Sequence, residues 1–247
     1  LNTTSGTIIK TATTDSSGNY SLSSMSAGWY TIVFSKSGYI AGNFNVYSCG
    51  SVGSQDVSIS TSLATGTMRI VLHWGASSGL TIVDSHLTGP DNNSSSTTSK
   101  YSWAQPGRFH IYWPNGKREY YYYTDNYSCT GCTNTQMSDN ATLDKDDTSA
   151  PGTETITIPT DSWRSGTYRY SAHDYTTAGS TGNASSTKFA ESGTTVKVYY
   201  NDTETTYNVP NSAGTLWTVF TIDGSSKVIT TVNSMSAVNQ AGSASIE

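Results

Sequence analysis

Aspartates and histidines are the residues of this chain whose types and spacing could do chemistry. One group forms a short acidic segment, and the other is spread over segments that alternate polar and apolar residues. The groups are Asp144, Asp146 and Asp147 in the acidic segment, and Asp84, His86, His110, His173 and Asp174 elsewhere. Closely spaced aspartates can surround a hard cation with oxygen ligands. Histidines combined with carboxylates suit zinc or a redox metal instead.

The acidic segment favours calcium as the bound cation, because carboxylate oxygens are its preferred ligands. We therefore expect Asp84, Asp144, Asp146 and Asp147 to bind a divalent cation. The EF-hand pattern is absent, so the spacing specifies no particular loop. Two alternatives stay open: a histidine-containing transition-metal site, and a solvated acidic turn beside histidines that only pack or hydrogen-bond.

Hydrolytic chemistry is not indicated by the sequence. Residues 75–79, GASSG, match the G-x-S-x-G pattern, and His173 is followed by Asp174. A nucleophile elbow needs a helix after the serine, whereas residues 80–83 are predicted to form a strand. No pair of carboxylates can be matched to a glycosidase by spacing. We therefore expect no enzymatic activity.

The three cysteines are Cys49, Cys129 and Cys132. The C-x-x-C spacing of Cys129 and Cys132 lacks the βαβ context of a redox pair and the second ligand pair of a zinc site. We expect a loop disulfide between Cys129 and Cys132, with Cys49 joined to either of them as the alternative. An odd number of cysteines outside the cell leaves one free or intermolecular thiol.

N-x-S/T sequons are frequent, and we expect several of them to carry glycan. The expected sites are Asn92, Asn93, Asn126, Asn140, Asn183 and Asn201, and further sequons begin at Asn2 and Asn19. Together with few lysines and many hydroxyl groups, they favour an extracellular or cell-surface glycoprotein. The net charge of −5 without a basic cluster argues against nucleic-acid binding. Apolar runs of about five residues are too short to span a membrane.

The elements that position these residues are predicted to be β-strands. The chain has 17 Tyr, 6 Trp and only 13% charged residues, a composition typical of half-buried strands with hydroxyl-rich outer faces. In residues 67–74, apolar side chains alternate with others at a period of two, and no helical stripe persists anywhere. Turn residues separate the expected strands, which lie at 6–13, 18–23, 29–36, 40–47, 55–60, 67–74, 80–88, 108–113, 119–123, 154–158, 167–174, 194–200, 205–209, 216–222 and 227–232.

The first expected domain, residues 1–62, carries two recognisable motifs. Residues 14–22, TDSSGNYSL, and residues 27–33, AGWYTIV, resemble the carboxypeptidase regulatory-like (transthyretin-like) β-sandwich module. Modules of that kind begin one or two strands earlier relative to these motifs. The resemblance therefore implies an immunoglobulin- or transthyretin-like sandwich that lacks its first strand or strands.

The second expected domain, residues 67–232, contains a further series of motifs. They are RIVLHW at 69–74, DSHLTGP at 84–90, LDKDDT at 143–148, GTYRY at 166–170 and GTLWTVF at 214–220. These motifs resemble an uncharacterised β-domain family of bacterial envelope and secreted proteins. The resemblance implies a larger β-sandwich and a surface location, and no particular activity. The family's GYGPE turn is replaced here by SAPGTE at 149–154.

Together these features predict an all-β structural subunit of an extracellular glycosylated fibre or surface assembly, which binds copies of itself. Residues 233–247 are too polar to form a core and could extend over about 50 Å. As a donor strand, this tail would complete the first domain of the next copy, so that subunits polymerise head-to-tail by strand complementation. The alternative is a calcium-dependent carbohydrate-binding or adhesion module of a larger secreted protein. The aromatic segments at 112–113 and 120–123 favour that alternative.

Overall fold

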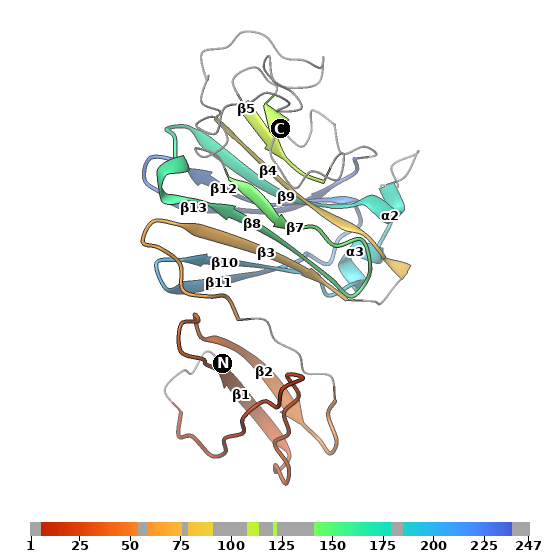
Figure 1. The fold of residues 1–247 in the computed structure, drawn as a ribbon. Coiled ribbons are helices and arrows are strands. Elements are labelled where there is room, and N and C mark those ends of the chain that lie inside the picture. Colours follow the sequence, from red (N-terminus) through yellow and green to blue (C-terminus); the bar gives the residue numbers. More distant parts are fainter. Residues whose placement is uncertain are drawn as a thin grey trace. The chain divides into compact units, whose positions relative to one another are not determined.

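The computed structural model describes residues 6–53, 59–75, 79–90, 108–113, 141–178 and 185–238, and the backbone of residues 121–122. The chain divides into two compact units, Leu1–Ser62 and Leu63–Glu247. The architecture is all-β, as expected from the composition, and its helices are short (Figure 1). In the described residues, no helix has the length and the apolar character needed to cross a membrane.

The first unit contains a two-stranded antiparallel sheet formed by β1 (Gly28–Phe34) and β2 (Gly42–Ser48). Its inner face is half-buried, and there Phe34 contacts the rings of Tyr20 and Phe44 at centroid distances of 5.2 and 5.7 Å. No third strand joins this sheet in the described part of the unit.

The predicted strands at residues 6–13 and 18–23 are not strands in the structure. The segment between them forms the expected turn, in which the Asp15 carboxylate accepts the backbone N–H groups of Ser17 and Asn19, both at 2.9 Å. The flanks of this turn nevertheless lack a ladder partner, and residues 6–13 are exposed. A turn signal alone does not make a hairpin when the flanking residues cannot bury a common face.

The second unit consists of two antiparallel sheets packed as a β-sandwich (Figure 1). The strands of the five-stranded sheet, in spatial order, are β11 (Thr203–Asn208), β10 (Thr195–Tyr200), β3 (Met68–Trp74), β8 (Gly152–Ile158) and β7 (Thr142–Lys145). Those of the six-stranded sheet are β13 (Ile229–Ser236), β12 (Leu216–Asp223), β9 (Thr167–Asp174), β4 (Val83–Pro90), β5 (Arg108–Ile111) and β6 (Tyr121–Tyr122). A 3-10 helix (Thr160–Ser162) and the one-turn helices α2 (Tyr175–Ala178) and α3 (Lys188–Glu191) connect strands.

Alternation along the strands builds the core between the two sheets. On β3, the alternate residues Met68, Ile70, Leu72 and Trp74 are buried, as the sequence pattern predicts. They form one cluster with aromatic residues of the facing sheet, among them Trp217. Because burying a large apolar side chain stabilises the fold by roughly 1.5–3 kcal/mol, this cluster is the main source of stability in the unit.

The last strand, β13, continues to Ser236, beyond the expected end at residue 232. Its partner β12 is long enough to pair with it up to Leu216, which lies opposite Ser236. The indole N–H of Trp217 also donates to the Asn233 side-chain oxygen at 2.8 Å. Residues 233–236 therefore belong to the sheet of the second unit, and the remainder of the expected tail after residue 238 lies outside the described residues.

Strand β4 is buried along its whole length, which is unusual for a strand that carries Asp84, His86 and Thr88. Val83 and Leu87 belong to the core between the sheets. Since successive side chains point to opposite faces, Asp84, His86 and Thr88 lie on the other face of the six-stranded sheet. That face holds the candidate site.

Candidate metal centre

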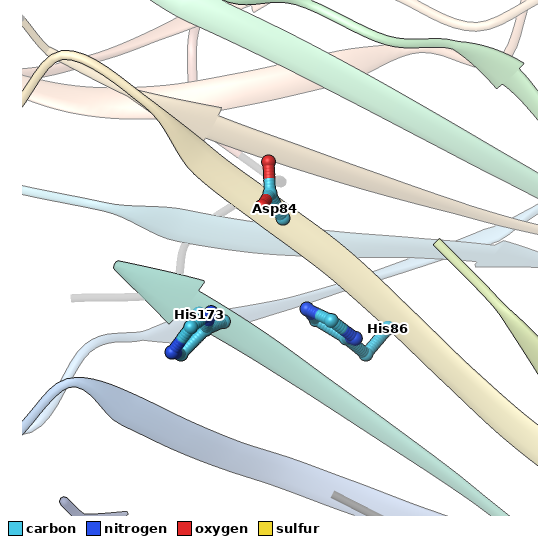
Figure 2. A group of neighbouring side chains, drawn as sticks. All are labelled: Asp84, His86 and His173. Carbon is cyan, nitrogen blue, oxygen red and sulfur yellow. The ribbon is translucent and has the colours of Figure 1, made fainter. Parts of the chain in front are cut away.

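Two neighbouring strands place an aspartate and two histidines side by side. Asp84 and His86 are two positions apart on β4, so they share one face of the strand. His173 on β9 pairs directly with Asp84 in the strand register. One ligand atom from each of the three residues lies within 4.8 Å of the others, and all three side chains are buried (Figure 2).

The second ring nitrogen of each histidine is engaged by a neighbour. His173 Nε2 lies 3.0 Å from the backbone oxygen of Val238, and His86 Nδ1 lies 2.8 Å from His110 Nε2. A carbonyl oxygen can only accept a hydrogen bond, so His173 carries its proton on Nε2 and has its lone pair on Nδ1. When His86 Nδ1 donates to His110, His86 Nε2 likewise has the lone pair.

Three buried atoms of this cluster have no hydrogen-bond partner: Asp84 Oδ2, His86 Nε2 and His173 Nδ1. Two of these atoms, His86 Nε2 and His173 Nδ1, are the nitrogens that carry the lone pairs in the tautomers described above. A buried polar atom without a partner costs about 1–3 kcal/mol. Histidine ligands of metals in proteins typically donate their other N–H to a carbonyl, a carboxylate or water, as His173 does here.

Burial sets the protonation of the site. It lowers the pKa of His86 well below its usual value, and the neighbouring His110 and His173 add to the effect. Burial also lowers the pKa of His173. Both rings are therefore neutral at neutral pH, which is the form that binds metals.

Burial shifts the pKa of the Asp84 carboxyl in the opposite direction. Burial raises its pKa to about 8, and the charges of Asp146 and Asp174 act in the same direction. Without a cation, Asp84 therefore keeps its proton at neutral pH. A cation bound beside it would displace that proton, because the attraction of an opposite charge favours the carboxylate.

Two further carboxyl groups lie near the three residues. Glu154 on β8 accepts the backbone N–H of Ser85 at 2.5 Å, and Asp174 accepts the backbone N–H of Thr177 at 2.8 Å. Burial raises the pKa of both carboxyls, and for Glu154 the charge of Asp84 adds to it. The surroundings of the site are thus dry and contain several carboxyl groups of raised pKa.

Aromatic packing also covers the site. The ring of Tyr112 stacks on His110 and His86, with centroid distances of 4.2 and 5.4 Å. Tyr112 is itself buried. Such an apolar shell limits the access of water and strengthens the interactions of a bound ion with its ligands.

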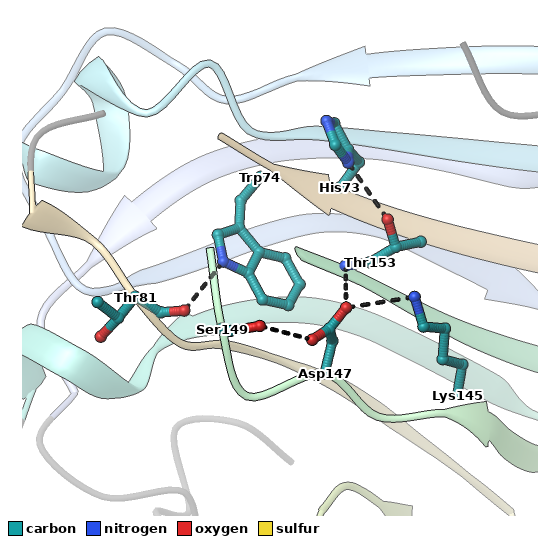
Figure 3. A network of polar contacts seen from close by, with 7 residues as sticks. All are labelled: His73, Trp74, Thr81, Lys145, Asp147, Ser149 and Thr153. Atoms are coloured by element: carbon teal, nitrogen blue, oxygen red, sulfur yellow. Dashed lines mark hydrogen bonds and ion pairs between the residues drawn. The ribbon is translucent and has the colours of Figure 1, made fainter. Parts of the chain in front are cut away.

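Of the acidic segment, Asp146 lies near Asp84, because its charge raises the pKa of Asp84 and its side chain hydrogen-bonds Glu154. Asp144 is exposed at the end of β7, where Thr142 Oγ1 donates to it at 2.7 Å. Asp147 forms an ion pair with Lys145 at 3.2 Å and accepts hydrogen bonds from the Ser149 hydroxyl and the Thr153 backbone N–H (Figure 3). These contacts make a closed turn within the segment.

The metal-ligating group formed by the described residues contains Asp84 but not Asp144, Asp146 or Asp147. Calcium binding by the acidic segment therefore stays a prediction. The sequence had included His86 and His173 among the candidates, but it could not show that the register of β4 and β9 brings them to Asp84. The D-x-H spacing of Asp84 and His86 on a predicted strand is the signal that could have shown that these two share a face.

The other predicted sites fall mostly outside the described residues. These are the sequons at Asn92, Asn93, Asn126, Asn140 and Asn183, and the cysteines Cys129 and Cys132. Asn201 lies in the exposed turn between β10 and β11, where its φ is +48°. Cys49 is exposed and is a free cysteine in the described part of the chain.

Comparison with protein-family models, with curated proteins and with solved structures found no match to this chain. The resemblances to the transthyretin-like module and to the envelope β-domain family therefore stay predictions. The proposals below are argued from the geometry and chemistry of the described residues.

Proposed function

We propose that the second unit is a metal-binding β-sandwich in which Asp84, His86 and His173 bind one divalent transition-metal ion. Two observations carry this proposal: one ligand atom of each residue lies within 4.8 Å of the others, and each of the three side chains has a buried polar atom without a hydrogen-bond partner. A cation would satisfy all three at once, and it would remove the cost of burying them.

Zinc suits this ligand set better than calcium does. Two imidazole nitrogens and one carboxylate are common ligands of zinc and of other first-row divalent metals. Calcium requires six to eight oxygen ligands, and of the three residues in this group Asp84 alone has a carboxylate. We propose a structural role for the ion, because it links the neighbouring strands β4 and β9 inside a buried site.

Metal titration of the purified chain tests this proposal. The chain is unfolded in denaturant with a chelator, refolded without metal, and titrated with zinc by calorimetry. We expect one zinc per chain. At 100 times its dissociation constant, zinc stabilises by about 2.7 kcal/mol, which raises Tm by roughly 5–10 °C for a unit of this size. Calcium at the same concentration should bind elsewhere or not at all.

Matched histidine variants identify the ligands. His86→Gln and His173→Gln should each abolish the zinc-dependent rise in Tm. His73→Gln is the control, because His73 is exposed on β3 and bonds Thr153 Oγ1 at 3.2 Å. Equal zinc binding by His86→Gln and the original chain would show that this cluster is not the site.

A second proposal concerns assembly, and a specific feature of the first unit favours it. Trp29, Val33 and Tyr47 are 68%, 58% and 46% exposed. Trp29 pairs with Tyr47 in the strand register, and their rings make an edge contact at 5.3 Å. Alternation places Val33 on the same face as Trp29. Adjacent exposed apolar side chains of this kind mark interaction surfaces.

We propose that this face and the edges of its two-stranded sheet contact further copies of the chain in an extracellular structural assembly. Unpaired sheet edges bind added strands through backbone hydrogen bonds. The sequons and the hydroxyl-rich composition support the extracellular location. A carbohydrate-binding or adhesion module is the alternative, because exposed aromatic rings also stack on sugars.

Electron microscopy with paired variants separates these functions. If the face is an assembly surface, the original chain forms filaments and Trp29→Ser with Tyr47→Ser disperses them. Val228→Ser, at an exposed position of the second unit, should leave filaments intact. Monomers whose tryptophan fluorescence responds to glycans in the original chain, but not after Trp29→Ser with Tyr47→Ser, would favour the binding module over assembly.

A further inference from the structure

We infer that metal binding and the docking of Val238 are coupled through His173, with the Val238 carbonyl as a positioning group for this ligand. The inference rests on the proposed metal site and adds its regulation. It connects a buried ion to the segment that follows β13.

Val238 is held by a compact set of contacts. Its N–H donates to Thr215 Oγ1 at 2.9 Å, and its carbonyl oxygen accepts from Thr215 Oγ1 at 2.8 Å and from His173 Nε2 at 3.0 Å. Its side chain is buried against Leu216. Just before it, the Thr215 N–H donates to the Ser236 carbonyl at 2.9 Å. Val238 is thus anchored by backbone and side chain together.

This anchor decides which nitrogen of His173 faces the metal. While Val238 is docked, its carbonyl keeps the proton on Nε2 and leaves the Nδ1 lone pair for the ion. If Val238 leaves, Nε2 loses its acceptor and the ring is free to carry the proton on Nδ1, which blocks metal binding. Loss of such an outer partner typically costs 10–100-fold in metal affinity.

The coupling acts in both directions. If docked Val238 raises metal affinity by a given factor, the bound metal favours docking by the same factor. Metal occupancy therefore controls how firmly the chain is held at residue 238. The residues after it continue from an anchor that the ion strengthens.

Variants of Thr215 test the coupling without touching a ligand. Thr215→Val keeps the shape of the side chain but removes both hydrogen bonds to Val238, and we expect it to weaken zinc binding by about 10–100-fold. Thr218→Val, on the strand β12 that follows Thr215, is the matched control, because Thr218 Oγ1 accepts from Arg169 Nη2 at 2.7 Å instead of bonding Val238. Its zinc affinity should stay within about twofold of the original, since it leaves the anchor intact.

Hydrogen exchange on the unaltered chain gives a second, independent measurement. Zinc should slow hydrogen exchange at the Val238 amide more than at the reference amide of Tyr207 on β11. The extra slowing should equal the factor by which Thr215→Val weakens zinc binding, because the coupling is reciprocal. A uniform slowing of both amides would report only global stabilisation and would overturn the coupling. Zinc binding with unchanged affinity in Thr215→Val would also overturn it, while leaving the metal site in place. If the original chain binds no zinc, both proposals fall.

Discussion

At the scale of single residues, the central feature is a set of ionisable groups whose burial decides their charge. Asp84 and Glu154 keep protons that exposed carboxyls would lose, and His86 and His173 stay neutral. In the proposed metal site, a proton and a cation would therefore compete for the Asp84 carboxylate. The consequences are measurable in single substitutions.

Asp84→Asn separates the metal role of this residue from its structural role. At pH 7 the original carboxyl is protonated, because its pKa is about 8, and an amide of the same shape mimics it. We expect a change in the metal-free Tm of less than about 2–4 °C, which corresponds to about 1 kcal/mol, together with loss of zinc binding. A large fall in the metal-free Tm would show that the carboxylate form already stabilises the fold.

Glu154→Gln tests the protonation of the second buried carboxyl. Because burial raises the pKa of Glu154 well above its ordinary value of 4.5, the folded chain keeps a proton that the unfolded chain loses above pH 4.5. The contribution of this residue to stability therefore falls as pH rises above 4.5, by up to about 1.4 kcal/mol per pH unit. The glutamine variant lacks that slope.

The measurement is denaturant unfolding of both metal-free chains at several pH values between 5 and 8. The variant should gain stability relative to the original as pH increases. The Ser85 N–H can still donate to the glutamine oxygen, so the change reports charge and not a lost hydrogen bond. Parallel pH profiles would contradict the protonated state of Glu154.

The residue types of the site could be read from the sequence, whereas their grouping could not. Asp84, His86 and His173 were all candidates. The preference of calcium for carboxylate ligands favoured the clustered Asp144, Asp146 and Asp147 as the partners of Asp84. The register that sets Asp84 opposite His173 depends on pairing between strands far apart in sequence, and no local pattern encodes that pairing.

At the scale of elements, the sequence predicted strand bounds best for strands that pair with a neighbouring strand on each side. β9 was expected at 167–174 and lies at Thr167–Asp174, because its alternation reflects one face against the core. Prediction failed where the formation of a strand depends on pairing that the local sequence does not reveal. Residues 6–13 have strand-like composition but no ladder, and β7 lies in a segment too acidic to suggest a strand.

Gly152→Ala probes how closely β3 and β8 approach. Gly152 lies opposite Trp74 in the register, and an added Cβ would overlap the Trp74 indole and the Ser149 carbonyl. Overpacking of this kind costs about 1–3 kcal/mol, so Tm should fall by roughly 3–10 °C. Calorimetry checks it, with Thr155→Ala on the outward side of β8 as the control. An unchanged Tm in Gly152→Ala would mean that the indole can move aside.

At the scale of the whole molecule, the sandwich of the second unit was predictable and the first unit was not. Period-two alternation and turn spacing identify an all-β chain, and the boundary between the units falls at Ser62. The first unit was expected to be an incomplete sandwich. Among its described residues, Ile40 is the only large apolar side chain that is fully buried, so the core that a sandwich needs is missing from that part.

This contrast predicts different independent stabilities for the two units. An isolated chain of residues 63–247 should unfold cooperatively, with the same Tm and the same zinc response as the full chain, because its core and the three ligands lie within it. An isolated chain of residues 1–62 should show no cooperative transition in calorimetry. Cooperative unfolding of that short chain would show that it needs no partner to fold.

The burial of β4 on both faces also determines how fast an ion can enter or leave. An ion held by buried ligands exchanges only when the strands open locally or the unit unfolds, and such openings are rare in a stable core. Exchange is then governed by opening of the fold and not by the strength of a competing chelator. In the proposed site, a bound ion would therefore exchange at the rate of local opening, and each zinc addition to the refolded, metal-free chain should reach equilibrium slowly.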